Sequence, residues 1–291
     1  MVLVVFLFLL TDGYKNQITN YHLMGWLIVY LWGLNRFVNI VIDNFQLKLS
    51  FNFLYDFLGK ELPKAEDNLD ELSKPLVRPI TNFSANKLSF SYPGKLPVFQ
   101  NISFTAEKGK VMAIYGGAGS GKSTLASLLN RLLPLEEGDI TIDGTNWQTF
   151  NNFQWRKCSS TVLQPVQLFN SSILENIGWV DRFMDQEKIT TFCKQTGFDK
   201  FFTKLPDGYA TNPYNLSVGQ KQMVALAAAI YRKPEILLLD EPFAYMDDEM
   251  KEFCWQMFHQ LKTEMVILIF TGNKEWANRA DSLVSLINEN F

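Results

Sequence analysis

Histidine, cysteine and an excess of positive charge are all missing or scarce in this 291-residue chain, and each scarcity excludes a class of protein. The chain has 2 histidines and 3 cysteines, and Cys158, Cys193 and Cys254 lie far apart, without a C-x-x-C pair. This spacing argues against a zinc site or a disulfide framework and fits a reducing compartment. The net charge of −3 argues against a nucleic-acid binder with a basic surface. A hydrophobic share of 47% with 20% charged residues excludes global disorder.

Charge is absent from one segment near the start of the chain. Residues 16–35 contain no Asp, Glu, Lys or Arg and include several aromatic residues. About 20 residues at about 1.5 Å each span a hydrocarbon core of about 30 Å, so the segment predicts a transmembrane helix, with a buried core helix as the alternative. The apolar run 2–10 is too short to cross a bilayer and lacks the features of a secretory signal. We expect it to be the end of a membrane helix whose beginning is missing.

A change in composition predicts a domain boundary after these segments. Residues 60–80 are dense in charge and contain three prolines, which is typical of a solvated linker. Beyond residue 81, short apolar runs alternate with helical patterns such as 122–133 and 220–231, and the runs predict buried strands at 111–115, 140–142, 236–239 and 266–270. We expect parallel strands with crossover helices, and therefore an α/β domain over residues 81–291.

A glycine-rich motif lies between the first of these strands and the helix after it. Its pattern is G-x-x-x-x-G-K-[ST], formed by Gly116, Gly117, Ala118, Gly119, Ser120, Gly121, Lys122 and Ser123 and followed by Thr124. Such a loop wraps backbone N–H groups around phosphates, while the lysine balances their charge and the serine hydroxyl binds Mg²⁺. The strand–loop–helix context makes the motif specific, so the sequence predicts binding of a nucleoside triphosphate with Mg²⁺. The loop alone does not choose among kinases, GTPases and transport ATPases.

Two carboxylates end the apolar strand at 236–239. Asp240 is expected to hold Mg²⁺, and Glu241 to polarise an attacking water. A strand followed by an ordinary acidic turn is the structural alternative.

Residues 215–222, Asn-Leu-Ser-Val-Gly-Gln-Lys-Gln, closely resemble the LSGGQ signature of ABC (ATP-binding cassette) transporters. Further motifs match this family in order: an aromatic loop at 90–93, the Q-loop at Gln164 and the D-loop at Asp247. The resemblance covers residues 81–291, and the segment before them is similar to the last membrane helices of an exporter. The chain is therefore identified as the C-terminal portion of an exporter-type half-transporter with fused membrane and nucleotide-binding domains.

This resemblance implies an architecture and a set of partners. The fold would be a P-loop NTPase of the ABC cassette type, with a mixed sheet core and a helical subdomain at about 171–233, preceded by one to two transmembrane helices. Residues 1–59 would be the C-terminal part of the transmembrane domain, 60–80 the linker, and 81–291 the nucleotide-binding domain, truncated at its C-terminus. Such cassettes pair head to tail, so a second ABC subunit, identical or different, is implied. The chain would be integral to the plasma (inner) membrane with its cassette in the cytoplasm, exporting an unidentified substrate.

The resemblance also assigns roles to residues. Tyr92 would stack on adenine, and Gln164 would sense the γ-phosphate, bind Mg²⁺ together with Ser123 and Asp240, and couple the site to the membrane part. Glu241 and Gln164 would be catalytic. The residues of the signature would act on the ATP of the partner subunit; they are Ser217, Val218, Gly219 and Gln220.

Two departures from the family pattern bear on activity. Gly272 stands where the family has a switch histidine, and it has no side chain to orient the attacking water. Val218 replaces the first glycine of the signature and adds bulk where a phosphate must approach. Two hypotheses follow: a slow but competent ATPase, or a degenerate ATP-binding half that depends on a partner for hydrolysis. A soluble P-loop kinase is disfavoured by the signature and by the apolar segment.

Overall fold

The computed structural model describes residues 30, 31, 33, 34, 36, 79–181 and 183–286. The chain divides into two compact units, residues 1–68 and residues 69–291. The described residues of the first unit are helical. Among the described residues, no helix is long and apolar enough to cross a membrane. The apolar run 2–10 and most of the predicted segment 16–35 lie outside the described residues, as does most of the linker, and these assignments stay predictions.

One sheet of the second unit is antiparallel. Its strands are paired in the order β2-β1-β4-β5, with bounds Pro97–Glu107, Asn82–Ser91, Glu137–Ile142 and Thr145–Asn146. The prediction that 140–142 joins a parallel sheet is therefore wrong. The reason is local: Ile140 and Ile142 alternate with an outward-facing residue, and Asp143 and Gly144 both have positive φ, so the chain turns straight back in a hairpin.

The second sheet is parallel and has five strands. Their order is β6-β7-β8-β3-β9, with bounds Ser159–Val162, Ile236–Asp240, Val266–Thr271, Val111–Tyr115 and Ser282–Ser285. Every residue of β7 and β8 is buried, as expected for continuous apolar runs covered on both faces. Tyr115 pairs with Thr271, and Asp240 with Phe270, so the carboxyl ends of β3, β7 and β8 meet at one edge. The predicted mixed sheet core is thus one antiparallel and one parallel sheet.

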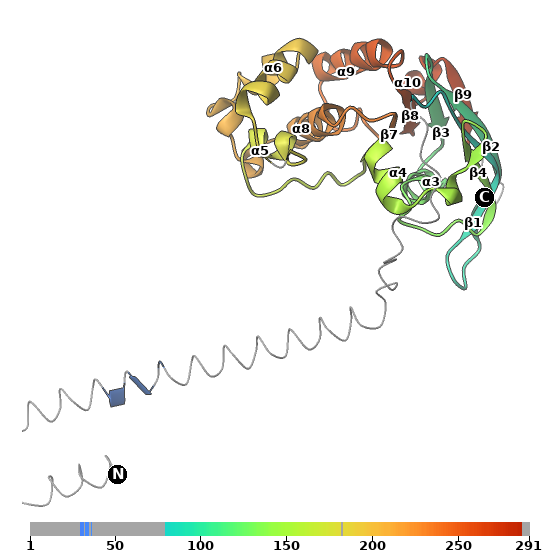
Figure 1. Cartoon of the computed structure of the whole chain (residues 1–291), viewed down its shortest axis with the longest axis horizontal. Coiled ribbons are helices and arrows are strands. Elements are labelled where there is room, and N and C mark those ends of the chain that lie inside the picture. Colours follow the sequence, from blue (N-terminus) through green and yellow to red (C-terminus); the bar gives the residue numbers. More distant parts are fainter. Residues whose placement is uncertain (1–29, 32, 35, 37–78, 182, 287–291) are drawn as a thin grey trace, which may run out of the picture. The chain divides into compact units, whose positions relative to one another are not determined.

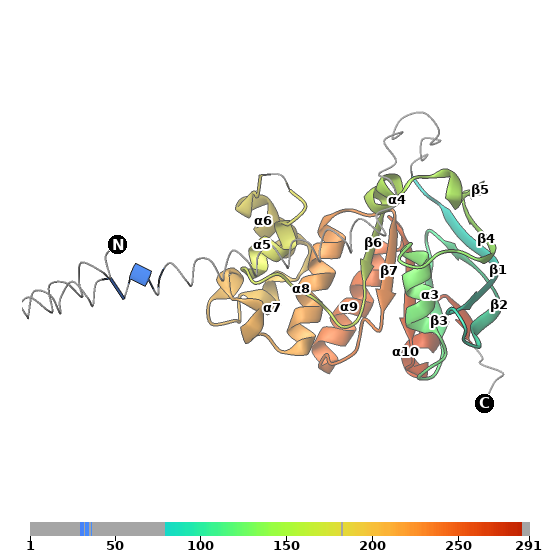
Figure 2. The ribbon, with the colours of Figure 1, turned by 90° about the horizontal axis from the view of Figure 1, so that it is seen from below.

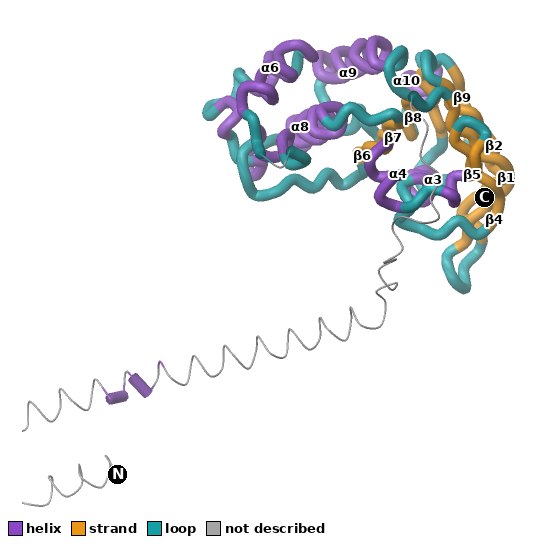
Figure 3. Tube along the Cα trace, in the orientation of Figure 1, coloured by secondary structure: helices purple, strands orange, loops and turns teal. Residues whose placement is uncertain are grey.

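Eight helices accompany the sheets within residues 79–181 and 183–286. They are α3 (Lys122–Leu129), α4 (Asn152–Cys158), α5 (Ile173–Gly178), α6 (Gln186–Thr196), α7 (Asp199–Phe202), α8 (Val218–Tyr231), α9 (Asp248–Leu261) and α10 (Lys274–Asn278). Helices α5, α6 and α8 lie at the end of this unit away from the antiparallel sheet, with the parallel sheet and α3 between (Figures 1 and 2). Figure 3 shows the same separation of helical and strand-rich regions. The predicted helix 122–133 ends earlier, at Leu129, because Asn130 caps it and Arg131 has a φ of 56°.

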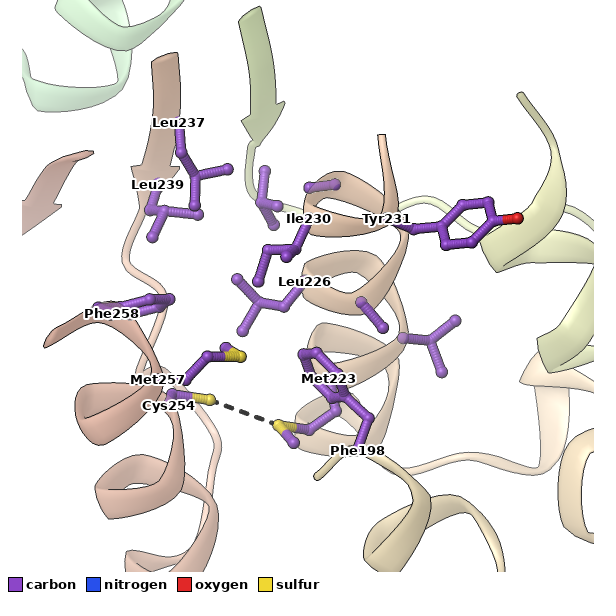
Figure 4. Packing of buried hydrophobic residues seen from close by; sticks show 14 of the residues in the cluster. Phe198, Met223, Leu226, Ile230, Tyr231, Leu237, Leu239, Cys254, Met257 and Phe258 are labelled. Carbon is purple, nitrogen blue, oxygen red and sulfur yellow. Dashed lines mark hydrogen bonds between the residues drawn. The ribbon is translucent and has the colours of Figure 1, made fainter. Parts of the chain in front are cut away.

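Two hydrophobic clusters hold these layers together. One fills the space between the antiparallel sheet, α3 and one face of the parallel sheet. The other joins β7 and β8 to α8, α9 and the helices at 173–202. In Figure 4, side chains of α8 such as Met223 and Leu226 face Met257 and Phe258 of α9, and the thiol of Cys254 contacts the sulfur of Met223 at 3.5 Å. The helical region is therefore packed onto the sheet that carries the predicted carboxylates.

Candidate active site

The glycine-rich loop connects β3 to α3, and its backbone requires glycine at defined places. Gly119 and Gly121 have φ of 77° and 92°, in the left-handed region where side chains are strained. A Cβ at Gly116 would lie 2.2 Å from the Ser120 hydroxyl. Within the described part of the chain, no side chain caps the N-terminus of α3. Its first N–H groups are therefore available to an anion, and the helix dipole adds to the attraction.

Lys122 lies folded back inside this loop. Its ammonium donates to the carbonyls of Gly116 at 2.8 Å and Gly117 at 3.0 Å. It also lies 3.6 Å from Oε1 of Glu241, in an ion pair whose lysine side is buried. The sequence placed Lys122 in the loop, and the structure adds its contact with Glu241. The loop thus presents one cation next to the carboxylate at the end of β7.

Asp240 is buried at the carboxyl end of β7, behind the loop. Burial raises the pKa of its carboxyl group, a hydrogen bond with Ser123 lowers it, and the nearby charge of Glu241 raises it further. Its Oδ1 and the Oγ of Ser120 are buried without a hydrogen-bond partner among the described residues. Burying a carboxylate oxygen without a hydrogen-bond partner costs free energy of folding unless a bound ligand interacts with that oxygen. Carboxylate and hydroxyl oxygens are ligands that Mg²⁺ accepts, so these residues fit a magnesium ion and phosphate oxygens.

Glu241 is held from several sides. Its φ of 46° is left-handed, its N–H donates to the carbonyl of Phe270 at 2.8 Å, and its own carbonyl accepts from Nε2 of Gln164 at 3.0 Å. The carboxylate accepts the Gly272 N–H on Oε1 at 2.7 Å and the Thr271 hydroxyl on Oε2 at 3.1 Å. Gln164, Glu241 and Gly272 were predicted separately from the sequence, and the structure brings them together.

The surroundings of Gly272 indicate what a side chain there would contact. A Cβ built on Gly272 would lie 3.3 Å from Glu241 Oε1, 3.3 Å from the carbonyl of Gly116 and 3.7 Å from the ammonium of Lys122. Its backbone lies outside the left-handed region, so an L-residue there has no backbone strain, although the two contacts at 3.3 Å are tight. Position 272 therefore adjoins the two members of the Lys122–Glu241 ion pair.

Tyr92 lies beside the same loop, from the antiparallel sheet. Its hydroxyl is 3.4 Å from that of Thr124 on α3, and its ring packs edge-on against Phe90. The ring is partly exposed, at 37%. An aromatic face next to the glycine-rich loop is what stacking on a nucleobase requires.

The signature residues form the start of α8. Ser217 caps this helix, accepting the N–H of Gln220, whose side chain bonds back to the N–H of Ser217. A Cβ on Gly219 would lie 2.5 Å from the carbonyl of Tyr245, so the signature packs closely against the D-loop. Val218 is exposed at 52%. In Figures 1 and 2, α8 and α3 lie apart with β7 between them, so the structure does not bring this signature to its own glycine-rich loop.

Replacing Ser217 by alanine tests this helix cap. Loss of a serine cap costs about 1 kcal/mol, so we expect the free energy of unfolding, measured in urea, to fall by about that amount. Asparagine at position 217 can still accept the N–H of Gln220 and should retain the stability. A fall equal to that of alanine would contradict the capping role.

Asp247 has the corresponding position on α9. It caps this helix by accepting the N–H of Met250 at 2.8 Å. The signature and the D-loop therefore each contain the residue that caps the N-terminus of the following helix.

Comparison with known proteins agrees with this arrangement. The sequence matches the ABC transporter family over residues 99–244, half of the chain. The chain belongs to the ABC transporter family. The matched region runs from β2 to the loop after Glu241, so it includes the glycine-rich loop, the signature and both carboxylates of this ABC domain.

Named relatives of this ABC domain include a lipid A-core flippase and a member of ATP-binding cassette sub-family B. It is 34% identical over 203 residues to an ATP-dependent lipid A-core flippase of Saccharophagus degradans, covering 68% of this chain and 35% of the flippase. It is 34% identical over 239 residues to ATP-binding cassette sub-family B member 5 of Mus musculus, covering 78% of this chain and 19% of that protein. The chain spans about a third of the length of the flippases that it matches.

A solved structure has the same fold. A bacterial Atm1-family ABC exporter with ATP bound superimposes with a TM-score of 0.73 at 24% identity, over 83% of this chain and 42% of that one. The ABC cassette fold of P-loop NTPases is thereby established, and ABC ATPase domains bind ATP.

One site residue escaped the sequence analysis. Thr271 contacts Glu241 from the end of β8, and no role was assigned to it from the sequence, although the neighbouring Gly272 was considered. The available signal was a single polar residue that ends an otherwise apolar, fully buried strand.

Proposed function

We propose that residues 81–291 bind Mg-ATP on the loop 116–124 and hydrolyse it with Glu241, driving export across a membrane. In this proposal residues 1–59 are the C-terminal part of a transmembrane domain with one to two helices, and 60–80 are the linker. The observation that carries the proposal is the carboxylate of Glu241, held beside Lys122 at the mouth of the glycine-rich loop. The chain would lie in the plasma (inner) membrane with its cassette in the cytoplasm.

The residues of the site divide the chemistry among them. The loop N–H groups and Lys122 would bind the phosphates, and Tyr92 would stack on the adenine. Mg²⁺, held by Ser123, Asp240 and Gln164 when bound, would neutralise phosphate charge and polarise the terminal phosphoryl group. The carboxylate of Glu241 would accept a hydrogen bond from the attacking water and orient it.

A second cassette completes the proposed site. The start of α8 lies apart from α3 in this chain, which supports a head-to-tail pair in which each signature covers the ATP of the other subunit. Ser217, Gly219 and Gln220 would then meet the partner's ATP, with Val218 exposed at the same surface. The partner would be an identical or a different ABC subunit.

A transmembrane domain of the assembled transporter would contact the cassette near Gln164. A hollow of about 350 Å³ follows this residue, lined by Leu163, Pro165, Phe169 and Trp179, among others. The rings of Phe169 and Trp179 stack at 4.1 Å and are both largely exposed. An exposed aromatic pair beside an apolar hollow supports docking of a protein segment there. Closure of the cassettes would be transmitted through this contact.

The absence of a side chain at Gly272 favours a second candidate function. A glycine offers Glu241 only a backbone N–H, at 2.7 Å, and no group that could reach a γ-phosphate. In this alternative the chain is a degenerate ATP-binding half that depends on a partner subunit for hydrolysis. The intact set of Lys122, Asp240 and Glu241 supports the first proposal.

Mg-ATP turnover by the full chain in lipid, with Glu241→Gln alongside, separates the two. Loss of an essential transition-state group costs about 10²–10³ in rate, so we expect kcat of Glu241→Gln to fall by about that factor. Glu249→Gln changes an exposed carboxylate on α9 and should leave turnover unchanged. Equal turnover of wild type and Glu241→Gln would overturn the proposal and leave the ATP-binding half.

A further inference from the structure

Thr271 contacts the carboxylate of Glu241 in a geometry that fixes the direction of its hydroxyl. The residue is 1% exposed, and its hydroxyl accepts the N–H of Asn273 at 3.1 Å. An oxygen that accepts there is free to donate its own hydrogen, and Glu241 Oε2 lies 3.1 Å away. Because a carboxylate only accepts, the hydroxyl must be the donor in this pair.

Two donors from consecutive residues therefore meet the two oxygens of one carboxylate. The Thr271 hydroxyl reaches Oε2 and the Gly272 N–H reaches Oε1. One donor on each oxygen fixes both the position and the rotation of the carboxylate plane, which a single bond does not. Lys122 adds a charge 3.6 Å from Oε1.

These donors come from rigid elements. Thr271 is the last residue of β8, which pairs with β7 on one side and β3 on the other. Asn273, whose N–H orients the Thr271 hydroxyl, is the cap of α10 and accepts the N–H of Glu275 at 2.8 Å. Groups fixed by a central strand and a capped helix keep their place when a substrate binds.

We propose that Thr271 is a positioning residue that, with the N–H of Gly272, holds the carboxylate of Glu241 in the orientation required for ATP hydrolysis. This inference rests on the proposed function, because it assigns Glu241 to the attack of water. It also deepens that function. The end of β8 at residues 271–272 would orient the carboxylate of Glu241, although Gly272 has no side chain. Without the hydroxyl, Oε2 loses its donor and the carboxylate can rotate about the bond to Gly272.

Thr271→Val removes the hydroxyl and keeps the shape of the side chain. We expect kcat to fall about 10- to 100-fold, the range for one hydrogen bond to a charged group, while KM and the Kd for Mg-ATP change less than about twofold. Thr271→Ser restores the donor and should recover most of kcat. The matched control is Thr196→Val on α6, whose hydroxyl donates to the carbonyl of Phe192 at 2.7 Å and which should turn over like wild type.

A second measurement needs no turnover. In nucleotide-free protein, the melting temperatures of Thr271→Val, Glu241→Ala and the double variant form a thermodynamic cycle. We expect the double variant to lose less than the sum of the two single losses, because the bond is already broken by either change. If the double variant lost as much as the two single variants together, Thr271 and Glu241 would not be coupled, and the positioning role would be overturned.

The outcomes distinguish a failure of the positioning role of Thr271 from a failure of the proposed ATPase function. Turnover that needs Glu241, falls in Thr271→Val and returns in Thr271→Ser supports the inference. Turnover that needs Glu241 but is unchanged in Thr271→Val overturns the positioning role and leaves the proposed function standing. Turnover that does not need Glu241 overturns the proposed function, and the positioning role with it.

Discussion

Replacing Lys122 by alanine is expected to weaken binding of Mg-ATP by at least about 100-fold, the lower end of the effect of two charge-assisted hydrogen bonds lost together. The ammonium lies inside the glycine-rich loop, 2.8 Å from the carbonyl of Gly116, where phosphate oxygens would compete for it. Alanine removes the only cation that the described contacts place beside Glu241. The Kd for Mg-ATP, measured by calorimetry at fixed ionic strength, reports the change.

The control for this variant is Lys110→Ala. Lys110 is an exposed lysine paired with Glu107 at 2.7 Å, between β2 and β3 and outside the loop. We expect its Kd to match wild type, which separates a local effect from a change in net charge. A Kd of Lys122→Ala within about twofold of wild type would place the nucleotide elsewhere on the chain.

Introducing histidine at position 272 is expected to raise kcat by about 100-fold, the lower end of the range for a transition-state-orienting group. The backbone is not left-handed, and a Cβ there lies 3.3 Å from Glu241 Oε1 and from the Gly116 carbonyl, so these two neighbours must shift by a few tenths of an ångström to admit it. The Cβ that carries the imidazole would lie 3.3 Å from Glu241 Oε1 and 3.7 Å from Lys122 Nζ. The imidazole could therefore share a water or a γ-phosphate with these groups. Steady-state turnover of Gly272→His against wild type measures the gain.

Gly272→Ala is the matched control, because it adds the same Cβ and the same crowding without an imidazole. We expect alanine to leave kcat near the wild-type value or slightly below it. Combining Gly272→His with Glu241→Gln should remove the gain, since the histidine acts on a water that Glu241 orients. If histidine and alanine gave equal turnover, the missing side chain would not limit hydrolysis.

Local patterns predicted the individual parts of the site well. The strand expected at 111–115 is β3 itself, and the loop after it needs its glycines for positive φ and close approach. The strand at 236–239 is β7, ending in Asp240 as expected. These predictions succeed because a buried parallel strand and a phosphate-binding turn each require a recognisable pattern of residues within a stretch of about ten.

The sheet topology was harder to predict. Residues 140–142 were assigned to a parallel sheet and belong to an antiparallel one, since a short strand does not indicate by itself which neighbour it pairs with. Partner choice depends on contacts with β1, more than fifty positions earlier in the chain. Single-sequence periodicity contains no information on such contacts.

The sequence by itself determined the family, the glycine-rich loop, the two carboxylates and the glycine at position 272, because each is a short motif whose chemistry depends on residue type and spacing. Only the tertiary structure decided which groups surround Glu241. Gln164, Glu241 and Thr271 come from three separate parts of the chain and meet because β7 and β8 are neighbours and the loop after β6 returns to their ends. A hydrogen bond between such residues depends on strand order and register, which no local pattern specifies.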